Sequence, residues 1–420
     1  MKISMSRFLL AALMFVLVVL GEGMTLRSYS LYLICGIMII YILATMHKNE
    51  EKFFVNTELV LLLAFLIYSG VSYLWSLDTA LTLYRTKVLF FLIALTFLLT
   101  NLFARDGEYD RFIVLYWAMA LILSILGIMR YGVSGIKNFI VSGVRLGKGD
   151  AMLLGHNPNT IGMDCAFAGV ITFYYFFFKG KKTALWALIP IAIIVVASGS
   201  RKGLFILMFG LMLIIFFLQM QKEKAALPML FKMLLIAAGL IAVVNLVLQF
   251  PGMEKAREQY MGLVNSLLGN EEEADVSTQI RENMVHVGWA QFLRKPILGI
   301  GVDNAKIINL QYNHFYGYLH NNYIEVLVNE GMVGFIIYYS FFIVVMKKHI
   351  NRLNEKNPLV YISFTMLVLR LITDWGRVSY FDYMNIPLFA FWIAVANKFD
   401  LGRENKVEPE KGSRYLRLRS

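Results

Sequence analysis

The chain is dominated by apolar runs of about twenty residues, and these runs restrict its possible folds more than any other feature. A helix of about 20 apolar residues crosses the hydrocarbon layer of a bilayer. Because 58% of the 420 residues are apolar and only 16% are charged, an ordinary soluble domain is excluded. We therefore predict an all-α polytopic integral membrane protein with about 12 transmembrane helices, at 8–21, 28–46, 56–75, 84–103, 112–131, 158–178, 183–199, 203–220, 229–250, 320–346, 358–375 and 384–399.

The Lys and Arg residues are distributed unevenly between alternate loops, and this bias predicts the orientation. The first apolar run follows Lys2 and Arg7 but lacks a good signal-peptide cleavage site, so we interpret it as a retained span. If the N-terminus is cytoplasmic, 22 of the 40 basic residues fall in inner segments and 15 in outer loops. Since basic residues favour the cytoplasmic side, we expect cytoplasmic termini. The net charge of +12 is then a topology signal and counts against nucleic-acid binding.

The predicted spans divide the chain into four parts. We expect transmembrane helices 1–9 in 1–250, a large extracytoplasmic loop with short helices in 251–318, transmembrane helices 10–12 in 319–400, and a basic cytoplasmic tail in 401–420. The large loop, between spans 9 and 10, has 68 residues and is long enough to form a cap over the membrane domain. A shorter outer loop is expected at about 132–157.

A short turn at the outer ends of the seventh and eighth spans places two cations together. It reads Ser198-Gly199-Ser200-Arg201-Lys202-Gly203. Backbone amides at a helix N-terminus and a guanidinium group bind anions, most naturally phosphate. Two structural alternatives remain open: the cations extend to lipid phosphates, or the two glycines form a helix-packing motif.

Two further polar clusters lie at the outer side. Arg281 is followed by Trp289 and by the segment Pro296-Ile297-Leu298-Gly299-Ile300-Gly301. Arg281 is a candidate anion ligand, although an ion pair with Glu282 is the structural alternative. His320 opens a predicted helix, where it either makes a structural hydrogen bond or accepts a proton from a sugar hydroxyl as a general base.

Several residue patterns of other enzyme classes are missing from the sequence. The outer segments have no Asp-x-Asp pair for metal-dependent sugar transfer, and no Cys/His spacing indicates zinc. The run Gly143 to Gly149 lacks the spacing and hydroxyl of a phosphate-binding loop. We therefore expect no metal and no cofactor, and a donor that is already activated and reaches the outer face in the membrane.

The sequence resembles the O-antigen ligase and O-antigen polymerase superfamily. The residues His320-Asn321, then Gly331 and Gly334, match the family pattern His-Asn-x9-Gly-x-x-Gly in residue type and spacing. The turn with Ser200 and Arg201 is similar to the family's Ser-x-Ser-Arg turn, and the segment from Arg281 to Gly301 is similar to part of its large loop. Leu74 to Asp78 and Asn157-Pro158-Asn159 also resemble family segments.

The resemblance implies an integral membrane glycosyltransferase of the C-type architecture in the bacterial cytoplasmic membrane. The implied donor is a glycan linked through pyrophosphate to undecaprenol, and the acceptor is a lipid-linked repeat unit or a lipid A core. Arg201 and Arg281 would hold the pyrophosphate, and His320 would be the general base. Charge and location add Lys202 and Arg145 to the candidate pyrophosphate ligands. Membrane lipids and other polysaccharide assembly proteins are the expected partners.

These roles predict a metal-independent, inverting transfer at the outer face of the membrane. We favour a polymerase of O-antigen, capsule or exopolysaccharide, with a lipopolysaccharide O-antigen ligase as the alternative. A transporter or flippase for the same lipid-linked glycan is a candidate from another class, and a scaffolding subunit is a third. A transporter requires charges near mid-span. Here only Lys232 and Arg370 lie well within apolar runs, and we expect both side chains to extend to the membrane surface.

Overall fold

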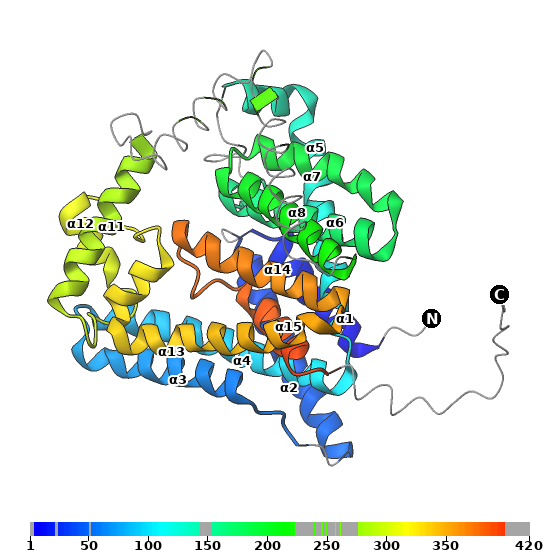
Figure 1. Cartoon of the computed structure of the whole chain (residues 1–420). Coiled ribbons are helices and arrows are strands. Elements are labelled where there is room, and N and C mark those ends of the chain that lie inside the picture. Colours follow the sequence, from blue (N-terminus) through cyan, green and yellow to red (C-terminus); the bar gives the residue numbers. More distant parts are fainter. Residues whose placement is uncertain are drawn as a thin grey trace, which may run out of the picture.

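The computed structural model describes residues 4–21, 24–49, 52–142, 146, 153–222 and 276–399, with isolated positions between 223 and 275 (Figure 1). These residues form helices and connecting turns, and no strand occurs among them. The predicted all-α class is therefore confirmed. The helices are α1 (Met5–Val18), α2 (Thr25–Asn49), α3 (Thr57–Val71), η1 (Ser72–Trp75), α4 (Thr79–Asp106), α5 (Arg111–Ser142), η3 (Leu153–Gly155), α6 (Pro158–Lys179), η4 (Lys182–Ala187), α7 (Leu188–Ala197), α8 (Arg201–Lys222), α11 (Val276–Arg294), α12 (Ala305–Asn313), α13 (Asn322–Arg352), η6 (Leu353–Glu355), α14 (Pro358–Thr373), η7 (Asp374–Gly376) and α15 (Asn385–Ala396).

Eight helical segments of the described chain are long and apolar enough to cross a membrane, which confirms a polytopic membrane protein. They are Thr25–Thr45, Thr57–Trp75, Thr79–Asp106, Arg111–Ser142, Pro158–Lys179, Arg201–Gln221, Asn322–Glu355 and Pro358–Gly376. Shorter apolar helices at Met5–Val18, Lys182–Ala197 and Asn385–Ala396 coincide with the first, seventh and twelfth predicted spans. Most of the ninth, 229–250, lies outside the described residues. The number of about 12 and the four-part division stay predictions.

The helices form two groups that α14 connects. In one group α13 packs on α3 and α15 packs on α4, and in the other α6 packs along α7 and α8 (Figure 1). α14 contacts both α8 and α15. α6 approaches α8 very closely, because Gly203 has no side chain and lies directly against the backbone of Gly162. Gly203 is therefore a helix-packing residue, as one of the two structural alternatives for the 198–203 turn predicts.

Asparagine side chains begin several of these helices. Asn157 and Asn357 each precede a proline and accept a hydrogen bond from the backbone N–H two residues later, at the starts of α6 and α14. Proline fits the first helical turn because its missing N–H would have no partner there. Asn321 starts α13 in the same way and accepts from the N–H groups of Tyr323 and Ile324 at 3.0 and 3.2 Å. The motif residue Asn321 is thus a helix cap.

α13 is interrupted at Gly331, and another segment fills the break. Gly331 has φ 62° and ψ −168°, a conformation that essentially only glycine adopts. The segment Pro296–Gly301 inserts here: the N–H of Gly301 donates to the carbonyl of Asn329 at 2.8 Å, and that of Met332 donates to the carbonyl of Pro296 at 2.8 Å. The two glycine-containing motifs therefore contact each other backbone to backbone.

The upstream residues 74–78 pack against the inserted segment. Trp75 Nε1 donates to the carbonyl of Leu298 at 3.0 Å, and the N–H of Leu77 donates to the carbonyl of Ile300 at 3.0 Å. The motif residue Gly334 lies against the ring of Tyr68, whose hydroxyl donates to the carbonyl of Glu330 at 3.0 Å. These motif residues thus build the framework around the break in α13.

α5 is also interrupted, at Gly132, where φ is 63° and ψ is 176°. The predicted fifth span, 112–131, ends one residue earlier. The following residues 133–142 continue as a second helical segment within the expected outer loop. The end of the apolar run therefore coincides with the break in α5, whereas the helical segment beyond it was not predicted.

We expect the Gly331→Ala substitution to destabilise the protein by at least about 3 kcal/mol, because its methyl group would meet the carbonyl of Ile297 and the backbone conformation disfavours a side chain. The matched control is Gly36→Ala in α2, where a methyl group would meet no atom within 4 Å. Alanine favours a helix interior over glycine by about 1 kcal/mol, so Gly36→Ala should be neutral or stabilising. Thermal unfolding in detergent compares the two, and equal midpoints would contradict the prediction.

Candidate active site

His320 is held in a constrained backbone conformation directly before α13. Its φ of 56° lies in the left-handed region, which is uncommon for a residue with a side chain. Asn321 caps the helix on one side. On the other side, the N–H of the buried Leu319 donates to Glu325 Oε2 at 2.9 Å. The position of the half-buried imidazole is therefore determined by the start of α13.

The segment after α14 is attached to the same end of α13. Asn322 Oδ1 accepts the N–H groups of Ser379 and Tyr380 at 2.8 and 3.0 Å, and Asn322 Nδ2 donates to the hydroxyl of Tyr339 at 2.9 Å. The hydroxyl of Ser379 donates to the buried Asp374 at 2.5 Å. The turn η7 is thereby fixed beside the residues that follow His320.

The turn between α7 and α8 is a capped helix start. Gly199 has φ 62°, and Ser200 Oγ accepts the N–H of Gly203 at 3.2 Å. The motif residue Ser200 is thus the cap of α8, and Arg201 and Lys202 form the first turn of that helix. Lys202 Nζ donates to the carbonyl of Gly376 in η7. This contact connects the cationic turn to the segment that packs against α13.

Arg281 comes to the site on α11. This helix packs against α13, with Gly288 close to Ile324 and Leu319. Trp289 lies on the same helix, about half exposed, with its ring centroid 5.2 Å from that of Phe292. α11 therefore brings one of the candidate arginines to the end of α13 that carries His320.

The charges of Arg281 and Lys202 both act on the pKa of His320. Burial lowers the pKa of His320, and the positive charges of Arg281 and Lys202 lower it further, to about 4. The structure therefore brings together three of the residues that the sequence indicated. Arg201 begins α8 directly before Lys202, while Arg145 lies outside the described residues. Leu146, the described residue closest to it, donates its N–H to the carbonyl of Ala197 at 3.2 Å, beside the cationic turn.

An ion-pair group ties α12 to α4. Arg85 donates to Asp303 at 3.1 Å and to the hydroxyl of Tyr318 at 2.9 Å, and Lys306 donates to Asp303 at 2.8 Å. The guanidinium carbon of Arg85 lies 3.6 Å from the ring centroid of Phe381. Arg85 therefore has a structural role, because it connects α4 to the start of α12.

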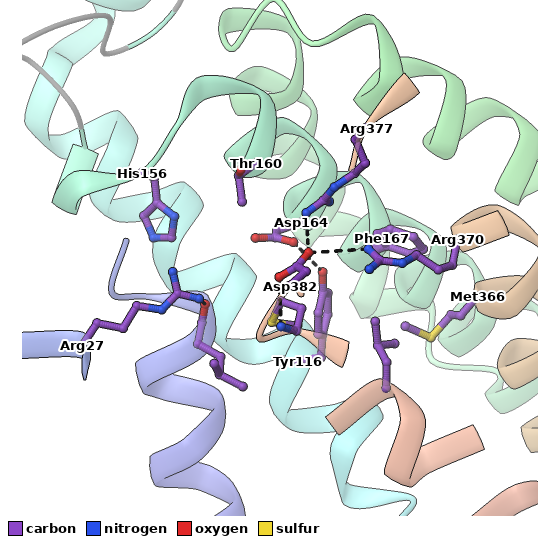
Figure 2. Close-up of a pocket in the computed structure, with 13 residues that line it drawn as sticks. Arg27, Tyr116, His156, Thr160, Asp164, Phe167, Met366, Arg370, Arg377 and Asp382 are labelled. Carbon is purple, nitrogen blue, oxygen red and sulfur yellow. Dashed lines mark hydrogen bonds and ion pairs between the residues drawn. The ribbon is translucent and has the colours of Figure 1, made fainter. Parts of the chain in front are cut away.

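The structure contains a buried charged cluster next to η7 that the sequence did not predict. Figure 2 shows Arg370 and Arg377 directed at Asp382, with Asp164 close by. Burial disfavours the Asp382 carboxylate, but Arg377 and Arg370 hold its pKa below the ordinary value. Arg370 is only 3% exposed, so the expectation that it extends to the membrane surface is wrong. A charge inside an apolar run needs a partner, and Asp374, four residues later in the same run, was the visible signal.

Beside this cluster lies a cavity of about 20 Å³, lined among others by Arg27, His156 and Asp164 (Figure 2). The hydroxyl of Tyr116 donates to Asp164 at 3.2 Å, and His156 Nε2 lies 3.1 Å from the carbonyl of Val19. The space holds about one water molecule, so it is far too small for a sugar. Within the described residues no group of three or more His, Cys, Asp or Glu side chains could hold a metal ion.

We expect the Arg281→Gln substitution to raise the pKa of His320, because it removes one of the positive charges that lower that pKa. Diethyl pyrocarbonate acylates only neutral imidazole, so the rate at His320 can be followed by peptide mass spectrometry. In the unmodified protein the rate should be nearly constant from about pH 5.5 to 8, since a pKa of about 4 leaves the ring neutral. In the Arg281→Gln variant it should fall toward the acid end. Arg294→Gln, on the same helix, is the control, and identical profiles for all three proteins would contradict the prediction.

Residues 183–339 match the family model described as O-antigen ligase. The matched segment contains Arg201, Lys202, Arg281 and His320. The match supports the superfamily that the motifs indicated. No curated protein matches the chain.

Proposed function

We propose that this chain, an O-antigen ligase/polymerase-type membrane enzyme by its match at 183–339, is an inverting, metal-independent glycosyltransferase for undecaprenyl-pyrophosphate-linked glycans. The observation that carries the proposal is the meeting of His320 with Arg281 and Lys202, whose charges both lower its pKa. A neutral imidazole beside fixed cations is the arrangement that a general base beside a pyrophosphate requires.

The reaction follows from these positions. His320 removes the proton from an acceptor hydroxyl, and the oxygen attacks the anomeric carbon of the donor sugar. The bond from that carbon to the pyrophosphate oxygen breaks, and undecaprenyl pyrophosphate leaves with the bonding electrons. A single displacement of this kind inverts the anomeric configuration. Arg201 and Arg281 stabilise the leaving group, because a guanidinium stays charged and presents paired N–H donors to phosphate oxygens.

Lys202 and Arg145 complete the proposed pyrophosphate site. Lys202 is already oriented through its bond to Gly376, so it supplies charge from a fixed position. We place this site at the outer face of the bacterial cytoplasmic membrane, with cytoplasmic termini, in agreement with the distribution of basic residues. Membrane lipids and other polysaccharide assembly proteins surround the enzyme in this proposal.

The acceptor divides the proposal into two versions. In the favoured version the acceptor is the end of another lipid-linked repeat unit, so the protein polymerises O-antigen, capsule or exopolysaccharide. In the alternative it is a lipid A core sugar, so the protein is a lipopolysaccharide ligase. The rival from another class is a transporter for the same lipid-linked glycan, for which the buried Arg370, paired with Asp382 at 3.5 Å and Asp374 at 3.6 Å, is the candidate intramembrane charge.

We expect His320→Asn, Arg201→Ala and Arg281→Ala each to lower glycan transfer by at least about a hundredfold, the typical effect of losing one such group. Asparagine tolerates the left-handed backbone at position 320, so this variant removes the base and keeps the backbone. His314→Asn is the matched control, because His314 also has a left-handed φ, of 53°. Arg294→Ala controls for Arg281 on the same helix.

Transfer is measured with purified protein in lipid nanodiscs, together with size-exclusion and thermal-unfolding profiles to establish folding. The control variants should keep near-normal activity. A folded His320→Asn protein with near-normal activity would refute the role of His320 as the base.

We further expect the purified protein to convert a defined undecaprenyl-pyrophosphate oligosaccharide into a ladder of longer lipid-linked products without metal or nucleotide. The same mixture with added lipid A core tests the alternative. Transfer only to the core would establish the ligase and contradict the polymerase. Translocation across vesicles without bond formation would contradict both and favour the transporter.

A further inference from the structure

Trp375 is a large aromatic side chain that the fold leaves uncovered beside the proposed active site. It occupies the middle of η7 and is 72% exposed. An exposed tryptophan beside a polar site contributes more contact surface than any other side chain. Its position therefore calls for a physical explanation.

The turn that carries Trp375 is fixed on both sides of it. Asp374 is fully buried, accepts the hydroxyl of Ser379 at 2.5 Å and forms an ion pair with Arg370 at 3.6 Å. The carbonyl of Gly376 accepts a hydrogen bond from the ammonium group of Lys202. The backbone at Trp375 is therefore held on both sides, so its ordering adds little to the entropy cost of binding.

The Trp375 ring has an aromatic neighbour, Tyr323. Its centroid is 6.3 Å from that of Tyr323, with the planes inclined by 50°. Tyr323 follows His320 by three residues, stacks on Tyr339 at 4.9 Å, and donates its hydroxyl to the carbonyl of Leu371 at 2.8 Å. Trp375 and Tyr323 thus form a two-ring surface. His320 precedes Tyr323 by three residues, and Lys202 is bonded to Gly376, the residue after Trp375.

The chemistry of this surface fits a sugar ring. The face of an aromatic ring carries partial negative charge, and the face of a pyranose presents polarised C–H groups. The hydroxyl groups of the pyranose point outward around its edge, where they stay hydrated or reach His320 and Lys202. We propose that Trp375 and Tyr323 form a sugar-stacking subsite for a pyranose ring of the glycan. This inference rests on the proposed transferase function, and the bound pyranose belongs to either the donor glycan or the acceptor glycan.

The test compares Trp375→Ala and Trp375→Phe with Trp186→Ala, a control in η4 whose side chain is 73% exposed. We expect Trp375→Ala to raise the KM for glycan substrate by about tenfold with kcat changed less than about threefold, which corresponds to the usual strength of an aromatic contact. Trp375→Phe should retain most of the wild-type KM, and Trp186→Ala all of it. Varying donor and acceptor separately shows which KM rises, and thus which glycan occupies the subsite.

Two binding probes separate this inference from the proposed function. Binding of the free oligosaccharide, followed by saturation-transfer NMR, should weaken in Trp375→Ala, whereas binding of sugar-free undecaprenyl pyrophosphate should not change. If the wild-type protein binds the oligosaccharide through Trp375 but transfers no sugar, the transferase proposal fails and the subsite stands. Equal oligosaccharide binding by Trp375→Ala and wild type would overturn the subsite. Equal weakening of both probes would also overturn it, because the ring would then serve the lipid interface.

Discussion

The end of the molecule that carries His320 depends on the insertion of Pro296–Gly301 into the break of α13 at Gly331. The carbonyl of Asn329 and the N–H of Met332, which a continuous helix would satisfy internally, are paired with the inserted segment. α11 ends only two residues before Pro296, and His320 lies at the start of α13. The insertion and the packing of α11 on α13 therefore position the helix that carries Arg281 relative to His320.

A second constraint is the pairing of buried charge. Arg85 with Asp303 and Arg370 with Asp382 each combine a buried cation with a carboxylate, since an isolated ion in a low-dielectric surrounding is costly. These pairs link α4 to the segment before α12, and α14 to the segment before α15. The charges of Arg281 and Lys202 also act on the imidazole of His320, whose pKa they lower.

Much of the fold and part of the site could be predicted from the sequence. Apolar runs identify the helices because burial in lipid requires about 20 apolar residues, and Asn-Pro pairs mark two helix starts because their capping chemistry is local. The motif resemblance selected Arg281 and His320 as candidates, and charge and location added Lys202. The Arg370 pairing and the helical segment after Gly132 were not predicted, because they depend on tertiary contacts and backbone torsions that local patterns do not encode.

The same cations that would bind the pyrophosphate also suppress the basicity of His320, and this opposition has a consequence for the order of binding. The pKa of His320 is about 4, so the ring is neutral but is a weak base. In the proposed mechanism a bound pyrophosphate would offset the charges of Arg281 and Lys202, although burial, the largest cause of the low pKa, would remain. His320 would then be a stronger base with the donor in place than without it. The proposed mechanism therefore predicts that the donor binds before the acceptor.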